Sequence, residues 1–439
     1  MTTMTVTPRR VKARTTGLRI KTDTPPTAIM TPTPPSIITF TADAAKLFAA
    51  VKTLSLLIPK GACPPGTDHI QLSGSRTGLR LTLRRPREIA ALHLPGAWAG
   101  RPIVMNAKEL LATLQRRRGG MTIRRDEDHA VVIFADGGAV NIKAFDTALE
   151  PMYPSIENPQ AVLRVDAGTL ADALRRSLPF TGKGEQRYAL NNICLAIQAG
   201  PKAMEVAASD THRLIRVVLP GDLMGRKDVN VILPGETVPG IYTLLTAQLG
   251  VVYGVGAEIV VTRKHIQVKM PGGAWFMVER ASFPFPRYRE VFPAVGVETP
   301  RVILDRKAMV TALKQLPVED EENRVSLSPA DGGRVLRLET NKATTTVYAY
   351  TAKMPDEALL NLDLLLSVLE SVPDDYVTLF IPPGHTPLRM DAGATTVLLM
   401  PLWDDSRPAK KCSPADRGAK SLMAALSLPD PDPAEFFGQ

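Results

Sequence analysis

The amino-acid sequence predicts an α+β protein built from three similar units, each with two helices packed on antiparallel sheet. The main observation is a repeated order of helix, strands, helix and strands, which occurs three times along the chain. The predicted first helices begin at positions 41, 166 and 304, which are 125 and 138 residues apart. With 439 residues, 44% of them hydrophobic and 22% charged, the chain is typical of a globular protein that is too long for one ordinary core.

The first helix of each unit shows apolar residues at helical spacing behind an Asp- or Thr-led start. This spacing predicts first helices over 41–55, 166–180 and 304–318. Each is followed by a strand-like apolar run, at 69–72, 192–197 and 324–327.

A second helix is predicted later in each unit, over 106–117, 236–249 and 362–372. A short apolar strand precedes each of these helices, at 103–105, 231–233 and 358–360. A hairpin follows each of them, within 122–134, 259–270 and 376–390.

Connections rich in Pro and Gly separate the units, at 152–159 and 292–296. The first 36 residues combine Thr, Pro and basic side chains with few large apolar groups, so they cannot bury enough surface to become ordered. The last 35 residues are again polar and rich in Pro. We therefore predict a disordered basic Thr/Pro-rich tail, three domains and a flexible C-terminal tail, at 1–36, 37–159, 160–297, 298–404 and 405–439.

Composition excludes several classes of protein. No run of about 18 apolar residues occurs, and the N-terminal segment lacks the apolar core of a secretory signal, so neither a membrane span nor secretion is expected. Cys63, Cys194 and Cys412 form no Cys-x-x-Cys pair, which favours a reducing compartment over disulfides or a zinc site. Phosphate-binding, His-Glu-x-x-His and calcium-loop motifs are absent from the sequence, so we expect neither a cofactor nor a catalytic metal.

The net charge of +9 favours a polyanionic partner, although a solvated basic surface explains it equally well. Basic residues recur on the predicted helices of all three units. If these helices share one surface, their cations would contact phosphates without reading bases. The candidate DNA-facing cations are Lys46, Lys52, Arg116, Arg117, Arg175, Arg176, Arg306, Lys307 and Lys314.

The stretch 187–214 reads as two strands joined by a loop, with polar residues gathered at the strand ends. Ser209, Asp210 and His212 could be taken for the site of a hydrolase. Strand alternation, however, would put Asp210 and His212 on one face and Ser209 on the other. We therefore favour a tight turn that Asp210 and Arg213 hold by hydrogen bonds and charge.

Three stretches resemble one known family. They read Arg-Tyr-Ala-Leu-Asn with Ala-Ser-Asp-Thr-His-Arg-Leu at 187–191 and 208–214, Phe-Pro-Arg-Tyr-Arg-Glu-Val-Phe-Pro at 285–293, and Leu-Leu-Met-Pro-Leu at 398–402. In this order they resemble the bacterial DNA polymerase III beta subunit, the beta sliding clamp. With the threefold outline, the resemblance covers about 37–404.

The resemblance implies three repeated DNA-clamp domains that form half of a homodimeric ring around duplex DNA. Such a protein is a non-catalytic, cytoplasmic processivity factor. Its partners would be sequence-independent double-stranded DNA, the DNA polymerase III alpha subunit, an ATP-driven clamp loader and other proteins with clamp-binding motifs. The alternatives are a clamp-related scaffold that does not encircle DNA and the hydrolase considered above.

The resemblance also implies an apolar pocket for partner peptides and adds Tyr188 to the DNA-facing residues. Glu290 and Asp363 depart from the family pattern and would make the pocket rim more acidic, while Thr211 replaces a usual glycine. The stretch 425–429 resembles part of a clamp-binding peptide and could occupy this pocket. The pocket would be lined by Leu190, Ser209, Leu214, Pro286, Val291, Leu398 and Met400, although ordinary inter-domain core is the alternative for the same residues.

Overall fold

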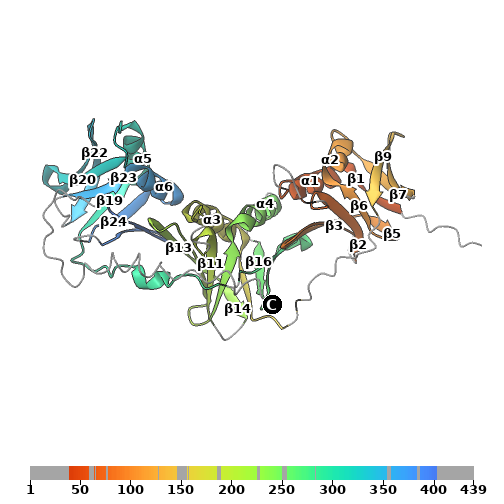
Figure 1. Ribbon diagram of the computed structural model, residues 1–439, viewed down its shortest axis with the longest axis horizontal. Coiled ribbons are helices and arrows are strands. Elements are labelled where there is room, and N and C mark those ends of the chain that lie inside the picture. The colour runs from red at the N-terminus through yellow and green to blue at the C-terminus, as the bar shows by residue number, and fades with distance from the viewer. Residues whose placement is uncertain are drawn as a thin grey trace, which may run out of the picture. The chain divides into compact units, whose positions relative to one another are not determined.

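The computed structural model of the protein (Figure 1) describes residues 39–58, 64, 66–75, 78–126, 128–145, 156, 158–184, 189–224, 228–249, 255–281, 283–352, 357–382 and 386–402. Both predicted tails, including 425–429, lie outside these residues, as does Tyr188. The described elements fall into three successive groups, here called the first, second and third repeats.

The first repeat contains helices α1 (Ala44–Ser55) and α2 (Ala107–Leu114). Its strands are β1 (Thr39–Asp43), β2 (His69–Ser75), β3 (Gly78–Arg85), β4 (Glu88–Leu94), β5 (Ala97–Ala99), β6 (Ile103–Asn106), β7 (Gly120–Asp126), β8 (His129–Phe134) and β9 (Ala139–Phe145).

The second repeat contains helices α3 (Ala167–Ser177) and α4 (Val238–Leu249), with short 3-10 turns at Leu178–Phe180, Gly235–Thr237 and Pro271–Gly273. Its strands are β10 (Ala161–Asp166), β11 (Asn192–Gln198), β12 (Ala203–Ser209), β13 (Arg213–Pro220), β14 (Asp222–Met224), β15 (Val229–Pro234), β16 (Gly256–Val261), β17 (His265–Lys269) and β18 (Trp275–Glu279).

The third repeat contains helices α5 (Arg306–Gln315) and α6 (Leu362–Ser371) and follows a 3-10 turn at Tyr288–Val291. Its strands are β19 (Arg301–Asp305), β20 (Arg324–Ala330), β21 (Val335–Glu339), β22 (Thr344–Ala352), β23 (Ala358–Asn361), β24 (Tyr376–Phe380), β25 (Leu388–Ala392) and β26 (Thr395–Leu399), with a further 3-10 turn at Asp331–Gly333.

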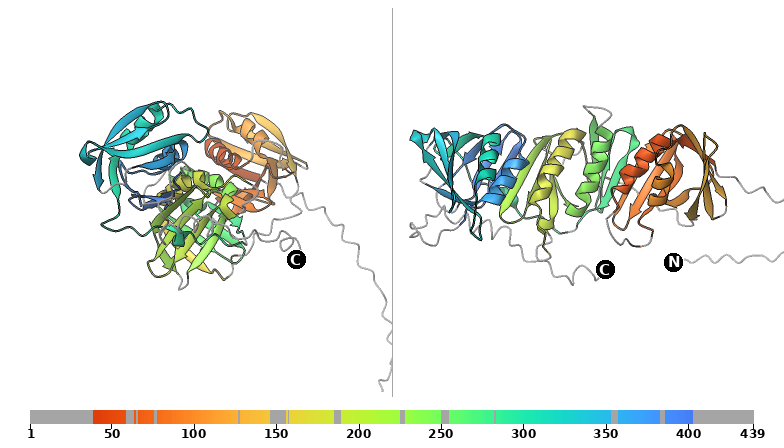
Figure 2. Two further views of the ribbon diagram at one scale, coloured as in Figure 1. Left: turned by 60° about the vertical axis from the view of Figure 1, so that its left-hand side comes forward. Right: turned by 90° about the horizontal axis from the view of Figure 1, so that it is seen from above.

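In each repeat the two helices pack together against one side of the strands (Figures 1 and 2). Five of the six helices begin directly after an Asp or Asn that ends the preceding strand. The side chain of this residue accepts a hydrogen bond from a backbone N–H of the first helical turn, which has no acceptor within the helix. The cap residues are Asp43, Asn106, Asp166, Asp305 and Asn361. The same junction of strand, cap and helix thus recurs through the chain.

The strands join across the repeats into two large antiparallel sheets, one of 14 strands and one of 12. The larger sheet continues from the first repeat into the second where β4 pairs with β18, for example Ala91 with Trp275. The smaller sheet continues from the second repeat into the third where β13 pairs with β26, for example Leu214 with Leu398. Backbone hydrogen bonding therefore runs through both junctions.

One apolar core fills the space between the helices and the sheets, and its largest fully buried aromatic side chains are Phe40, Phe180 and Phe276. Gly240 in α4 permits close packing at the first junction, because a Cβ there would stand 3.2 Å from Leu57 and 3.3 Å from Phe276. No helix in the described part of the chain is long and apolar enough to cross a membrane.

The predicted helices and strands are present, with corrected ends. The first helix begins at Ala44 and not at position 41, because Thr39–Asp43 is strand β1, paired with β5 and β7. The helix predicted from 304 begins at Arg306 for the same reason, since β19 runs to Asp305. The described residues all belong to one compact unit, and the predicted boundaries near 160 and 298 stay a prediction.

Candidate functional site

A second, smaller apolar cluster lies on the face of the β11–β12–β13–β26 sheet opposite the main core. Alternate strand residues point to opposite faces, so Ile193 and Leu195 enter the core while Cys194 and Ala196 enter this cluster. Its buried members are Leu190, Cys194, Ala196, Ala207, Leu214, Ile232, Tyr288, Val291 and Leu398. The segment that connects the second and third repeats covers this face with Phe283, Phe285, Tyr288, Val291 and Phe292.

The structure brings the predicted pocket residues to this place. Leu190, Leu214, Val291 and Leu398 belong to the cluster, and Met400 packs against it while remaining partly exposed. The two others are buried beside it: Ser209 pairs in register with Leu214, and the carbonyl of Pro286 accepts a hydrogen bond from the N–H of Tyr288. These side chains are mostly apolar, so they supply contact area with little hydrogen-bonding demand.

A buried carboxylate fixes the connecting segment over the cluster. Glu205 on β12 is 7% exposed, and its Oε2 accepts from the Tyr288 hydroxyl at 2.6 Å and from Arg289 Nε at 2.8 Å. Arg216 on β13 lies 3.9 Å from Glu205 and stacks over Phe292 at 4.6 Å. Burial, together with this hydrogen bond to Glu205, raises the pKa of the Tyr288 hydroxyl, which therefore stays a donor.

Sequence reasoning missed Glu205. A signal was nonetheless present, because Glu205 is the one charged residue in the otherwise apolar strand Ala-Met-Glu-Val-Ala-Ala-Ser. A buried acid needs donors, and the Tyr-Arg pair of the 285–293 motif supplies them from a segment 83 residues away.

The residues 209–213 form the predicted tight turn between β12 and β13. Asp210 Oδ1 accepts from the N–H groups of His212 and Arg213 at 3.1 and 2.8 Å, and its Oδ2 accepts from Arg213 Nη2 at 2.6 Å. Ser209 is fully buried and donates its hydroxyl to the carbonyl of Arg213 at 2.8 Å. The serine is therefore bonded within the turn and is not directed to His212 as a nucleophile would be.

Thr211 adopts a φ of 82° in this turn, the left-handed region that favours glycine. The turn is therefore formed although threonine stands here in place of the glycine usual in the resembled family. A β-branched residue instead occupies a backbone conformation that is strained for it.

Two arginines connect the second repeat to the third. Arg213 donates to the carbonyl of Pro179 at 3.0 Å and to Ser367 on α6, and it stacks over Phe180 at 5.0 Å. Arg176 on α3 donates to Thr395 Oγ1 at 2.6 Å and pairs with Asp172 at 2.6 Å. Arg176 is only 8% exposed, so the prediction that it faces DNA is corrected: its guanidinium is bonded inside the protein.

The other predicted DNA-facing cations differ in their surroundings. Lys46, Lys52 and Arg116 are exposed and form no ion pair with any described residue. The others have acidic or carbonyl partners: Arg117 with Asp136 at 2.7 Å, Arg175 with Asp172 at 2.8 Å, Lys307 with Asp375 at 2.7 Å, Lys314 with Glu370 at 2.7 Å, and Arg306 with the carbonyls of Asp374 and Leu369 at 2.8 and 3.4 Å.

The two acidic departures from the family pattern are both exposed. Glu290 lies 3.6 Å from Arg287, so the charge at this point of the connecting segment is balanced. Asp363 on α6 accepts a hydrogen bond from Asn323 Nδ2 at 2.6 Å.

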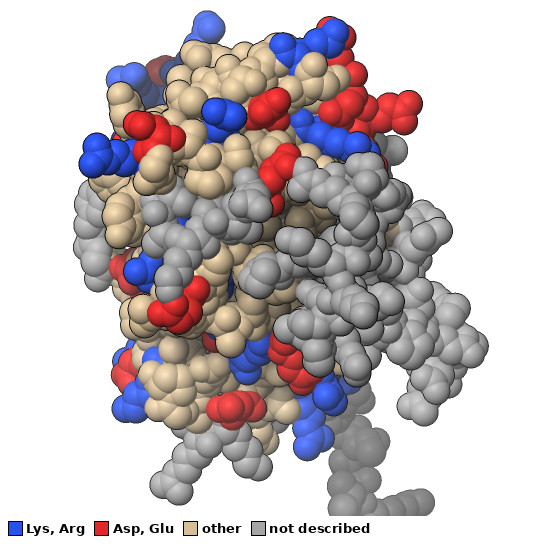
Figure 3. Space-filling model, turned by 90° about the vertical axis from the view of Figure 1, so that its left-hand side faces the viewer, with Lys and Arg blue, Asp and Glu red and all other residues tan. Residues whose placement is uncertain are grey.

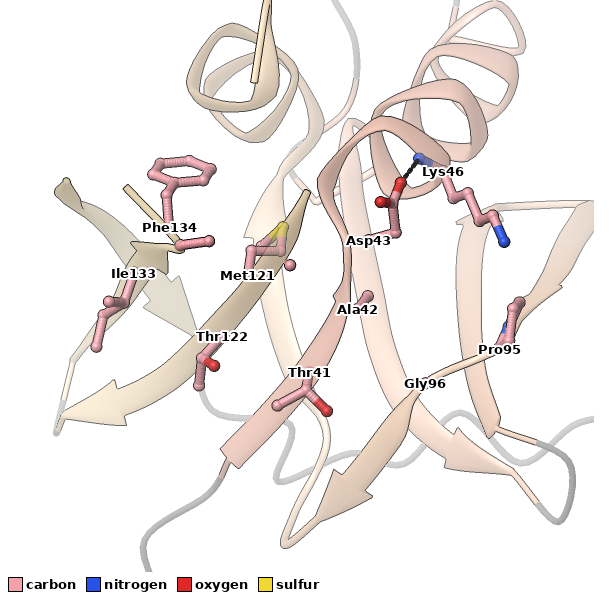
Figure 4. Close-up of a pocket in the computed structure, with 12 residues that line it drawn as sticks. Thr41, Ala42, Asp43, Lys46, Pro95, Gly96, Met121, Thr122, Ile133 and Phe134 are labelled. Atoms are coloured by element: carbon pink, nitrogen blue, oxygen red, sulfur yellow. Dashed lines mark hydrogen bonds between the residues drawn. The ribbon is translucent and has the colours of Figure 1, made fainter. Parts of the chain in front are cut away.

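A separate hollow of about 640 Å³ lies in the first repeat (Figure 4). Its lining includes Thr41 and Asp43 of β1, Lys46 of α1, and Ile133 and Phe134 of β8. None of the predicted pocket residues lines it, and the Asp43 carboxylate that faces it caps α1 through the N–H of Lys46 at 2.9 Å.

Within the described ranges, no three His, Cys, Asp or Glu side chains are grouped as a metal site would require. Cys194 is buried in the second cluster, and this burial raises the pKa of its thiol to about 12. The thiol is therefore protonated at neutral pH and a poor nucleophile.

The fold is that of the DNA polymerase sliding clamps, as comparison with solved structures shows. Three of these are a DnaN sliding clamp (DNA polymerase III subunit beta) from Pseudomonas aeruginosa bound to griselimycin, a DNA polymerase sliding clamp from Bacillus subtilis, and a DNA polymerase III beta subunit from Thermotoga maritima. Their TM-scores are 0.73, 0.73 and 0.70, at 18%, 16% and 13% sequence identity. Each match covers 84% of this chain and 100% of the other.

No protein-family model matches the sequence, and no curated protein matches it. At these identities the comparisons establish the fold. They confirm the predicted α+β architecture of three clamp-type repeats and the resemblance that the short motifs indicated.

Proposed function

We propose that this protein is a DNA sliding clamp, a processivity factor that encircles duplex DNA as a homodimeric ring. The observation that supports this most strongly is the match to sliding clamps over their whole length, which includes all three repeats. Each repeat offers a pair of helices on one side of its strands, and in the proposed ring these helices line the central hole.

Retention on DNA would follow from enclosure. Exposed cations on the helices, such as Lys46 and Lys52, would add a weak attraction to phosphates that does not depend on base sequence and falls with salt. No catalysis is part of this function. The ring would act in the cytoplasm, would be opened by an ATP-driven loader and would hold the polymerase alpha subunit on its template.

We propose that partners dock at the second cluster, beside the connecting segment. Met400 packs against the cluster and is partly exposed, as are Phe283, Phe285 and Phe292, so a short peptide bearing Leu or Phe would find apolar side chains at its edge. Four of the seven proposed pocket residues are buried members of the cluster beneath them. Tyr288 and Arg289, tied to Glu205, would keep this wall in place when the peptide binds.

Retention on circular DNA tests the ring. The protein is loaded on a nicked circle and separated from free protein, and the circle is then cut. A clamp stays on the intact circle and is lost once the DNA is linear. A scaffold that does not encircle DNA gives the same low retention on both forms, and this outcome would refute the proposal.

Titration of a Leu/Phe-bearing partner peptide tests the pocket. We expect Met400→Glu to weaken binding at least about tenfold, a loss of about 1.4 kcal/mol, because it places a charge against apolar surface. Met224→Glu is the matched control, since Met224 is an exposed methionine on β14 outside the cluster. Equal affinities of the two variants would exclude this site.

A further inference from the structure

We propose that the electrostatic attraction to DNA differs between the repeats, an inference that rests on the proposed clamp function. The attraction is concentrated on the helices of the first repeat. In the third repeat, carboxylates neutralise the lysines of that repeat's own helix. The partner chemistry is the phosphate backbone of duplex DNA. The groups that set its local strength are the acidic side chains Glu370 and Asp375.

The third repeat carries three cations on α5, and each is already engaged. Lys307 Nζ lies 2.7 Å from Asp375 Oδ1, just beyond α6, and Lys314 Nζ lies 2.7 Å from Glu370 Oε1 on α6. Arg306 donates to backbone carbonyls and is partly buried. The hydrogen bond and charge of Lys307 hold the pKa of Asp375 below its usual range, so this carboxylate is ionised at neutral pH.

In the first repeat Arg117 is paired with Asp136 at 2.7 Å, but the lysines of its two helices are not paired with any described residue. Lys46 and Lys52 of α1, Lys108 of α2 and Arg116 just after α2 are exposed, and none of them forms an ion pair with another residue in the described part of the chain. Glu109 is the single acidic residue on α1 and α2. These four cations can meet phosphates without first giving up an ion-pair partner among the described residues.

The second repeat is intermediate. Arg175 and Arg176 on α3 share Asp172, at 2.8 and 2.6 Å, and Arg176 is buried. Helix α4 carries no charged side chain in its sequence Val-Pro-Gly-Ile-Tyr-Thr-Leu-Leu-Thr-Ala-Gln-Leu.

The charges visible at one end of the third repeat are mixed in sign. Figure 3 faces the end of the molecule that carries β20 and β22, and there Lys and Arg side chains lie among Asp and Glu with no large area of one sign. Exposed lysine–carboxylate pairs add little to stability, so their main effect here is on the field that DNA would meet.

The expected size of the effect follows from counterion release. Each phosphate neutralised by a protein cation contributes about 0.9 to the slope of log Kobs against log salt. A lysine that leaves its carboxylate partner to bind a phosphate places an unpaired negative charge near the DNA. The net contribution of such a lysine to the salt slope is therefore small. Two free lysines therefore carry a slope of about 1.8, and two paired ones carry much less.

Binding to a short linear duplex, measured over a range of salt concentrations, tests the inference without requiring a closed ring. Lys46→Ala with Lys52→Ala should lower the magnitude of the slope by about 1.8. Asp375→Asn with Glu370→Gln should raise it by up to about 1.8, because these changes release Lys307 and Lys314 while keeping side-chain size.

The matched control is Asp331→Asn with Glu339→Gln, which gives the same change in net charge at exposed positions on the strands and turns of the third repeat. We expect it to leave the slope nearly unchanged. The inference is overturned if the Asp375/Glu370 variant behaves like this control, if the Lys46/Lys52 variant keeps the wild-type slope, or if the wild type shows no salt-dependent binding. If the variants give the expected salt slopes but the protein is not retained on circular DNA, the proposed ring is refuted and the inference about the charges stands.

Discussion

Replacing Glu205 tests how the connecting segment is held on the second cluster. Glu205→Ala removes the acceptor of the Tyr288 hydroxyl, at 2.6 Å, and of Arg289 Nε, at 2.8 Å. Tyr288 is 5% exposed, and a buried donor without an acceptor costs about 1–3 kcal/mol. The Arg289 side chain is 43% exposed and can turn to water, so its share is about 1 kcal/mol or less. We expect a total loss of about 1–4 kcal/mol.

A double-mutant cycle with Tyr288→Phe separates the hydrogen bond from the lost volume of the glutamate. If Tyr288 and Glu205 act together, the double variant should be less destabilised than the sum of the single variants, by about 1–2 kcal/mol. The free energy of opening is measured by native-state hydrogen exchange at the amides of β11, β12 and β13, which reports this sheet and not the whole chain.

Glu339→Ala serves as the control, because Glu339 is an exposed glutamate on strand β21 and forms no ion pair with the residues that the structure describes. Its effect should stay within about 0.5 kcal/mol. A coupling energy below about 0.5 kcal/mol between Glu205 and Tyr288 would refute the reasoning, since sites that do not interact add within that margin.

Three further predictions concern single residues. Thr211→Gly should raise the free energy of unfolding by about 0.5–1 kcal/mol, as measured by thermal denaturation. The reason is that the strain of a left-handed backbone at threonine exceeds the entropy cost of glycine, whereas Thr211→Ala keeps that strain and should give no such gain. In a variant that keeps Cys194 as its only cysteine, iodoacetamide at pH 8 should label the thiol only after denaturant is added; rapid labelling of the folded protein would contradict its burial and raised pKa. Burial, and then the charge of Arg80, lower the pKa of His93, so the unfolded chain binds more protons near pH 6.5 and stability should fall as the pH drops below about 6.5; His93→Gln should flatten this profile of Tm against pH.

Five of the six helices were predictable because each combines a periodic apolar stripe with an Asp or Asn cap directly before its first residue. Asp166 and Asn361 are examples, each placed directly before the first helical residue. Where the prediction began too early, at position 41, the reason is tertiary: Thr39–Asp43 is extended because it pairs with β5 and β7. Periodicity within one segment carries no information about such partners.

The candidate site was predictable only in part. Short motifs led to Leu190, Leu214, Val291 and Leu398, which the fold gathers into one cluster. Burial of a charged residue depends on partners that are distant in sequence. Arg176 looked like an exposed helix cation, yet Thr395 lies 219 residues further on and accepts its hydrogen bond. Glu205 was missed for the same reason, since its donors lie 83 and 84 residues away.

The pairing of β13 with β26 and of β4 with β18 limits how the chain can be divided. A fragment cut at either junction would lose a neighbouring strand and expose a long row of free N–H and C=O groups. Such an edge invites pairing with other copies, so fragments made for crystallography or for peptide screening should be prone to aggregate. Fragment design would need Lys or Pro on the newly exposed strand, or the retention of both repeats that share it.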